Sequence, residues 1–247
     1  MKMFTLKICL IVLIDTSIFF QTLDAQVSLP ILPFSKQYEL NSEIPILELP
    51  HFNNDSLDFL FNNPTKSTYT KNTVGLVTPL DIDMLRLGRW DSIESEKIVW
   101  RLRLISPGSK GLRISCDQFL LPKGASLFFY DSTGSRCYGA FTELNNQPHG
   151  RFSTGILPME DVTIEYNHHS NNQEIIAPFH INKISYIFRV QDIGEADQQC
   201  DIDANCPNWA NEWCNEIRSV VKILFRSRIG IVETDNIGSG VLINPSC

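Results

Sequence analysis

The sequence predicts an all-β protein whose central part is an antiparallel β-sandwich. Between residues 98 and 190, apolar and polar residues alternate over short stretches, as they do on half-buried strands. Turns rich in proline and glycine separate these stretches, and no helical spacer lies between them. The chain has 247 residues, of which 43% are hydrophobic, and this suffices for one sizeable packed core.

The clearest alternation lies at residues 100–104, where Trp100, Leu102 and Leu104 alternate with Arg101 and Arg103. Further strands are predicted at 112–117, 127–130, 162–166 and 184–188. Turns that contain proline and glycine, at 106–108, 121–124 and 147–150, divide them. Short strands divided in this way indicate a β-sandwich over residues 98–190.

Residues 1–25 have the pattern of a secretory signal peptide. Lys2 and Lys7 form its basic start, and the apolar stretch 8–14 ends at Asp15. The mature protein is therefore expected to be secreted, either extracellular or periplasmic. No window reaches the run of about 18 apolar residues that a membrane-spanning helix requires, so we expect no integral membrane segment after signal removal.

Residues 26–97 are predicted to form a loosely structured lead-in. Proline and asparagine are frequent, especially between residues 26 and 71, and hydrophobic periodicity is weak. One short helix is expected around residues 56–61. This segment would precede the sandwich without belonging to its core.

Cysteine usage agrees with export. Cys9 lies in the signal, and an even set of six remains, which suggests disulfides without fixing their pairing. The candidate disulfide cysteines are Cys116, Cys137, Cys200, Cys206, Cys214 and Cys247. Cys116 and Cys137 can be bridged only if their strands are neighbours, because a disulfide needs Cα atoms within about 7 Å. No C-x-x-C pair occurs, so neither a zinc ribbon nor a thioredoxin-type redox centre is indicated.

Two blocks of short motifs carry a family resemblance. The first comprises 88–90, 99–104, 106–108, 119–125, 127–130, 139–142 and 145–146, and the second comprises 200–207, 217–223 and 238–244. In their order and spacing, these motifs resemble precursors of secreted trypsin-like serine peptidases of the lysyl endopeptidase type. The resemblance covers about residues 73–247. It implies that the sandwich is a pro-region and that residues 191–247 are the start of a chymotrypsin-like β-barrel.

The resemblance also implies what this chain lacks. In the family, the strand that resembles 240–244 is followed by the turn with the catalytic histidine, and this sequence stops at Cys247. The cysteines that correspond to Cys200 and Cys206 normally pair with partners further along, and Gly238 stands where the family usually has cysteine. We therefore assign no catalytic residue, expect no peptidase activity from this chain alone, and expect protein substrates only if a full protease exists. By resemblance, the sandwich would assist folding of the protease and cover it until processing.

Other motifs that imitate functional sites are better explained by structure. Gly238-Ser239-Gly240 lacks the spacing of a nucleophile elbow and is predicted to be a turn that enters a strand. The segment from Asp201 to Glu212 imitates a calcium loop, but Cys206 occupies the position that needs glycine. The neighbours His168 and His169 would point to opposite faces of an extended chain. None of the five histidines lies in a context typical of a catalytic base, and no metal site is assigned.

The aromatic and charged residues narrow the choice of ligand and partner. Trp90 and Trp100 could form a sugar-stacking platform, but the alternation favours core packing for Trp100. The formal net charge is −7, which argues against nucleic acid because phosphate contacts need a basic face. No cofactor and no certain partner is assigned.

Two alternatives to the precursor fragment remain open. The chain is either a stand-alone extracellular β-sandwich binding module with a vestigial protease segment, or a truncated gene model of a full protease. In the precursor fragment, the strands around Ile223 and Val241 are expected to expose unpaired edges, because the rest of the barrel is missing.

Overall fold

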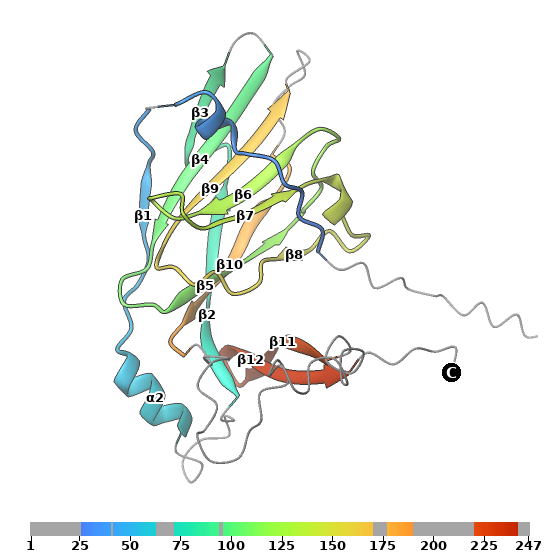
Figure 1. Cartoon of the computed structure of the whole chain (residues 1–247). Coiled ribbons are helices and arrows are strands. Elements are labelled where there is room, and N and C mark those ends of the chain that lie inside the picture. Colours follow the sequence, from blue (N-terminus) through green and yellow to red (C-terminus); the bar gives the residue numbers. More distant parts are fainter. Residues whose placement is uncertain are drawn as a thin grey trace, which may run out of the picture.

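The protein is a sandwich of two mainly antiparallel sheets, which confirms the all-β class (Figure 1). The computed structural model describes residues 26–40, 42–62, 72–93, 96–169, 177–189 and 220–241. The helices in this part of the chain are short: α1 (Phe34–Gln37), α2 (Asn54–Asn62) and a 3₁₀ turn at Glu143–Asn145. α2 confirms the helix expected around residues 56–61.

The first sheet has the strand order β1-β4-β9-β6-β7, with β3 also paired to β4. Its strands are β1 (Ile46–Glu48), β3 (Arg89–Ile93), β4 (Lys97–Ile105), β6 (Ser126–Tyr130), β7 (Cys137–Phe141) and β9 (Asp161–His169). All neighbours are antiparallel except β1 and β4, which pair in parallel.

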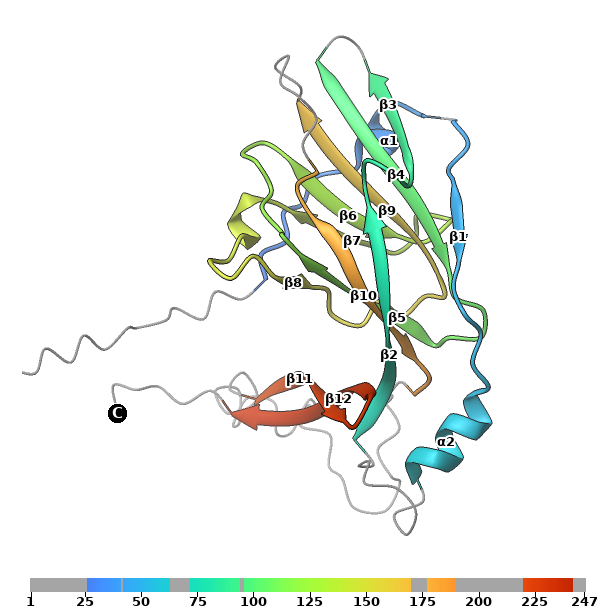
Figure 2. The same ribbon diagram turned by 180° about the vertical axis from the view of Figure 1, so that it is seen from behind.

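The second sheet has the order β11-β12-β2-β10-β5-β8, and all its described pairs are antiparallel. Its strands are β2 (Thr73–Asp83), β5 (Gly111–Asp117), β8 (Phe152–Ser153), β10 (His180–Ile187), β11 (Val220–Ile229) and β12 (Val232–Val241). In Figures 1 and 2, the β11–β12 hairpin lies at one end of the sandwich, beside the start of β2.

The core lies between the two sheets. Trp100 has no exposed surface and donates its indole N–H to the carbonyl of Leu87 at 2.8 Å. Stacked Phe119 and Phe152, with ring centroids 4.5 Å apart, fill the region next to it together with Phe179. The alternation over residues 100–104 therefore places its apolar set as predicted.

The lead-in differs from its prediction, because residues 26–97 form three strands of the sandwich. β2 lies in the middle of the second sheet, with β10 on one side and β12 on the other. It is buried on both faces at its start, so Thr73, Val74, Gly75 and Val77 do not alternate in polarity. A strand of this kind has no period-two signal to detect.

Residues 29–40 and 42–45 cross the outer face of the first sheet, and we call these residues the strap. Leu29 exchanges both backbone hydrogen bonds with Ala140, and the Ser35 N–H donates to Glu165 Oε1 at 3.0 Å. Glu165 and Arg101 are buried under it, with 0% and 2% exposed surface. The polar set of the alternation therefore faces a second covering layer instead of solvent.

The C-terminal hairpin also differs from its prediction. The sequence predicts strands around Ile223 and Val241, with a turn at 238–240. β11 instead ends at Ile229, and β12 begins at Val232 and includes Gly238, Ser239 and Gly240, opposite Ile223, Lys222 and Val221. The tip is the turn Gly230-Ile231, where Gly230 has a φ of 61°. Sequence reasoning missed most of β12 because its buried part is Thr234-Asp235-Asn236-Ile237, in which only Ile237 is apolar.

Candidate functional site: the junction of hairpin and sandwich

The hairpin is joined to the sandwich by a short ladder between β12 and β2. Thr234 pairs with Leu76, Asp235 with Gly75 and Asn236 with Thr73. Gly75 lies close to β10, because a Cβ atom at this position would lie 2.7 Å from Ile187 Cδ1, the end of a side chain. This close approach brings Asp235 over the neighbouring strands of the second sheet.

Asp235 is the centre of a buried ionic cluster. Its side chain has no exposed surface, and its Oδ1 accepts from Arg113 Nη1 at 2.9 Å and from Arg226 Nε at 2.9 Å. Oδ2 accepts from Ser185 Oγ at 2.5 Å and from Arg226 Nη2 at 3.2 Å. Arg226 Nη2 also donates to Ser115 Oγ at 3.2 Å. One carboxylate of the hairpin is therefore bonded to β5 and β10 of the sandwich as well as to its own partner strand.

The cluster holds two cations on one anion. Burial lowers the pKa of the Arg113 guanidinium; the carboxylate of Asp235 opposes this shift, and the positive charge of Arg226 adds to it. The guanidinium group of an arginine is a cation in proteins. The cluster thus has an excess of one positive charge.

A second ionic contact lies nearer the tip of the hairpin. Glu233 Oε2 accepts from Lys183 Nζ at 2.7 Å, and Glu233 Oε1 is bonded to Arg228. The hydrogen bond from Lys183, opposed by partial burial and aided by Arg228, lowers the pKa of Glu233. Asn236 completes the junction, because its Oδ1 accepts from Thr73 Oγ1 at 2.8 Å inside the protein.

The described residues of the junction bind and orient the hairpin. They include no hydroxyl or thiol paired with a histidine base. Nucleophilic catalysis needs a hydroxyl or thiol within hydrogen-bond reach of a base. In the part of the chain that the structure describes, no histidine lies within hydrogen-bond distance of a serine or cysteine side chain. Ser239, between the two glycines of β12, is exposed.

The cysteine candidates are only partly within the described residues. Cys116 is buried on β5 of the second sheet, Cys137 is exposed on β7 of the first sheet, and both are free. Their strands are not neighbours, so the condition for a disulfide between them is not met. Cys200, Cys206, Cys214 and Cys247 lie outside the described residues, as do the calcium-like segment 201–212 and the signal 1–25.

The histidines lie apart from one another, save for the adjacent pair at the end of β9. His168 and His169 are the last two residues of that strand, where adjacent side chains point to opposite faces. His149 lies in a turn, where its Nδ1 accepts from the N–H of Arg151 at 3.0 Å. No group of three or more histidine, cysteine, aspartate or glutamate side chains within the described ranges is arranged to hold a metal ion.

His180 has the most charged surroundings of the five. Its Nδ1 lies 2.7 Å from Asp117 Oδ1 and its Nε2 lies 2.9 Å from Asp81 Oδ1, so it links β10 to both neighbouring strands. Partial burial opposes the charge, but these two hydrogen bonds outweigh it and raise the pKa of His180. Sequence reasoning missed this cluster, because Asp81 and Asp117 are far from His180 along the chain.

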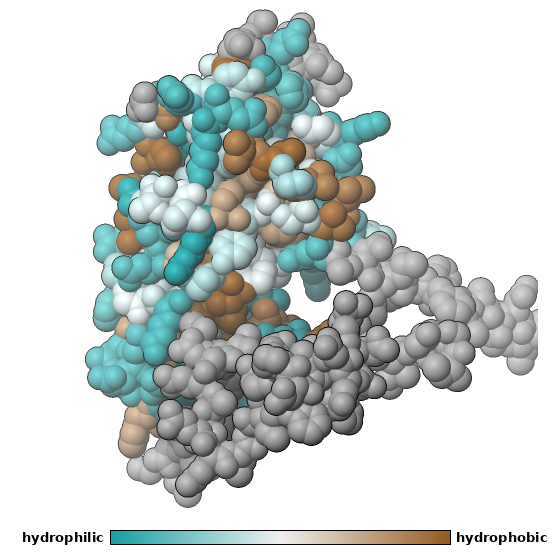
Figure 3. All heavy atoms as spheres, in the orientation of Figure 1, coloured by the Kyte–Doolittle hydropathy of each residue, from teal (hydrophilic) through white to brown (hydrophobic). Residues whose placement is uncertain are grey.

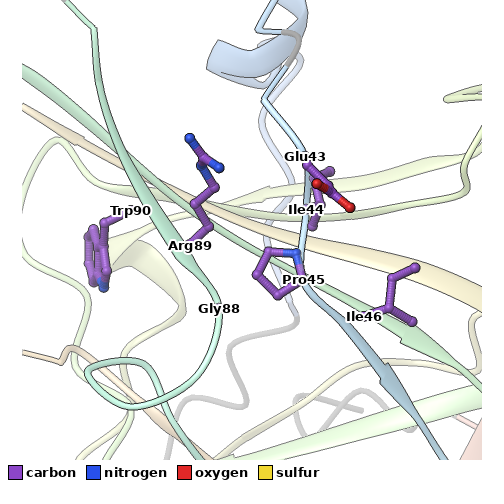
Figure 4. Close-up of a pocket in the computed structure, with 7 residues that line it drawn as sticks. All are labelled: Glu43, Ile44, Pro45, Ile46, Gly88, Arg89 and Trp90. Atoms are coloured by element: carbon purple, nitrogen blue, oxygen red, sulfur yellow. The ribbon is translucent and has the colours of Figure 1, made fainter.

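The tryptophans do not form a shared platform. Trp100 is in the core, whereas Trp90 is half-buried, donates to the carbonyl of Met84 at 3.0 Å and packs edge-on against Tyr166. Trp90 lines an open groove of about 610 Å³ between the strap and the start of β3, together with Glu43, Ile44, Pro45, Ile46, Gly88 and Arg89 (Figure 4). Arg89 Nε is bonded to Asp91 at 2.9 Å, so the groove presents no unpaired cation to a ligand.

Comparisons with known proteins add no identification. No family model, no curated protein and no solved structure matches this chain. Among the helices of the described residues, none is long and apolar enough to cross a membrane.

Proposed function

We propose that this chain is a secreted pro-region that carries the first hairpin of a trypsin-like serine peptidase and holds it in an extended, paired state. By itself it has no peptidase activity. The proposal combines the resemblance of residues 73–247 to peptidase precursors with the geometry of the junction. A second function, a stand-alone extracellular binding module, is the alternative.

The observation that carries the proposal is the position of Asp235. This residue belongs to the peptidase-like segment, yet its carboxylate is bonded to Arg113 and Ser185 of the sandwich. A two-stranded hairpin is marginally stable alone in water. Pairing with β2 supplies the hairpin with a third strand, and Arg113 supplies a counterion for its buried acid. A pro-region that assists folding would have to do both.

The test separates the two parts of the chain covalently. A specific protease site is introduced within residues 191–199, the full chain is purified and cleaved, and the pieces are analysed by size-exclusion chromatography and intact mass. We expect the pieces to elute together, because the ladder and the ionic cluster do not depend on the linker. Asp235→Asn should release the C-terminal piece, whereas Asp161→Asn, which breaks an Arg–Asp pair in the first sheet, should not.

Two further measurements distinguish the alternatives. The intact mass of the exported protein reports removal of residues 1–25 and any processing near Gln199, and an unprocessed chain would favour the binding module. A serine-directed fluorophosphonate should leave the purified chain unlabelled. Labelling together with amide hydrolysis would refute the assignment of no activity, and separation of the pieces of the cleaved wild-type chain would refute the holding role.

A further inference from the structure

The outer edge of β11 is open. β11 is the outermost strand of the second sheet: one edge pairs with β12 over its whole length, and no strand of the described residues pairs with the other edge. An edge strand presents unpaired N–H and C=O groups that any fitting extended chain can bind.

One face of the hairpin is apolar and accessible. Val221, Ile223 and Phe225 project on the same face as Gly238 and Gly240, since a Cβ atom on Gly240 would lie 2.7 Å from Ile223 Cδ1 and one on Gly238 would lie 3.6 Å from Phe225 Cε1. Ile223 and Phe225 are both 44% exposed. Within the described residues, the cross-strand partners of Val221 and Ile223 are the glycines of β12, which have no side chain to cover them, and Asn236 lies opposite Phe225. The view in Figure 3, by contrast, shows polar and apolar residues interspersed over the sandwich.

The other face of β11 carries a row of positive charge at Lys222, Arg226 and Arg228. The two nearby acids do not neutralise this row, because each of them is shared with a cation outside β11. Asp235 is paired with Arg226 and Arg113, and Glu233 is paired with Arg228 and Lys183. Lys222 has no acidic partner within the described ranges. The row therefore keeps an excess of positive charge in a chain whose formal net charge is −7.

We propose that β11 binds, as an added strand, an extended segment of a partner protein in which apolar residues alternate with aspartate or glutamate. Strand addition supplies main-chain hydrogen bonds, and the alternating side chains supply specificity. The apolar residues would extend the face of Ile223 and Phe225. The aspartates or glutamates of the partner would lie on the opposite face, beside the basic row. Their Cβ atoms would be about 5 Å from those of the basic residues opposite them. This inference goes beyond the proposed function and needs only that the hairpin is docked.

A second copy of this chain does not fit the same edge. In a two-fold pair of β11 strands that overlap over residues 220–228, Lys222 would lie opposite Arg226 and Val220 opposite Arg228. Like charges directly opposite each other destabilise a strand pair. The charge pattern thus favours an acidic partner over self-association.

The test uses the full chain and synthetic peptides of about nine residues, the length of a typical strand. The probe alternates valine and glutamate. One control peptide alternates valine and lysine, and another has the probe's composition with valines and glutamates in separate blocks. Binding is measured by fluorescence anisotropy, and the bound region is located by hydrogen exchange of the β11 amides.

We expect the alternating acidic peptide alone to bind with a Kd below about 1 mM and to protect β11 amides. Lys222→Glu should weaken binding about fivefold, since one attractive cross-strand pair becomes repulsive. Lys110→Glu, an exposed lysine between β4 and β5, should leave binding unchanged. Absence of binding, equal binding of the three peptides, protection away from β11, or self-association through β11 would each overturn the proposal.

Discussion

Substitution of Asp235 by asparagine should detach the hairpin. Asparagine keeps the size of the side chain but removes its charge, so Arg113 and Arg226 lose their shared counterion. Breaking a buried ion pair by neutralising one partner destabilises a protein by about 3–5 kcal/mol. We expect the lower end, about 3 kcal/mol, because the side chains of Arg113 and Arg226 are 13% and 23% exposed and water can reach them.

The loss should appear as local opening. Within the described residues, the backbone contacts of the hairpin with the sandwich are the pairs between Thr234–Asn236 and Thr73–Leu76 and one hydrogen bond from the Ile237 N–H to the carbonyl of Asn72. The rest of the second sheet does not need this pairing, so the hairpin can open before the sandwich unfolds. A loss of about 3 kcal/mol corresponds to roughly a hundredfold faster amide exchange. Hydrogen-exchange mass spectrometry of β11 and β12 should detect it, while β4 and β9 keep their protection.

The control for charge loss elsewhere is Asp161→Asn, which removes the partner of Arg103 in the first sheet, where Arg103 Nε lies 2.7 Å from Asp161 Oδ1. It should leave hairpin exchange unchanged. Addition of Arg226→Leu to Asp235→Asn should recover part of the loss, because it removes one of the two unpaired cations. Unchanged hairpin protection in Asp235→Asn, or an equal loss of protection in β4 and β9, would refute the reasoning.

Four further outcomes follow from individual residues. Two aspartates raise the pKa of His180 against partial burial. The stability that His180 contributes is therefore present below the unfolded pKa of about 6.5 and is lost as the pH rises through the raised value. His180→Gln should lower the urea midpoint at about pH 5.5 more than at about pH 9. Gly88→Ala should destabilise by about 3 kcal/mol, since its φ is 88° and a Cβ would lie 2.4 Å from the buried indole beneath it. Gly124→Ala, with a φ of 82° and no atom within 4 Å, should lose only about 1 kcal/mol by thermal melting. Iodoacetamide with peptide mapping should alkylate exposed Cys137 long before buried Cys116, whose pKa burial raises.

The sequence predicts those strands of the sandwich whose signal is local. Trp100, Leu102 and Leu104 reveal their face because the pattern repeats every two residues. The same pattern misassigns Arg101 and Glu165, which read as solvent-facing and are buried at 2% and 0% exposure. The strap covers both side chains. Because this covering layer comes from a distant segment, the periodicity within one strand cannot predict it.

The junction could not be predicted for a related reason. Thr234-Asp235-Asn236 reads as a turn or an exposed edge, because aspartate is almost never buried without a partner. Its partners Arg113 and Ser185 lie on two other strands, and only the assembled sheet brings them together. A buried ion pair contributes little net stability compared with apolar packing. It does penalise misplacement, since a one-residue slip of β12 against β2 would turn Asp235 to the other face and leave Arg113 buried without its counterion. The cluster therefore fixes where the hairpin docks more than how strongly, which is what the proposed function requires.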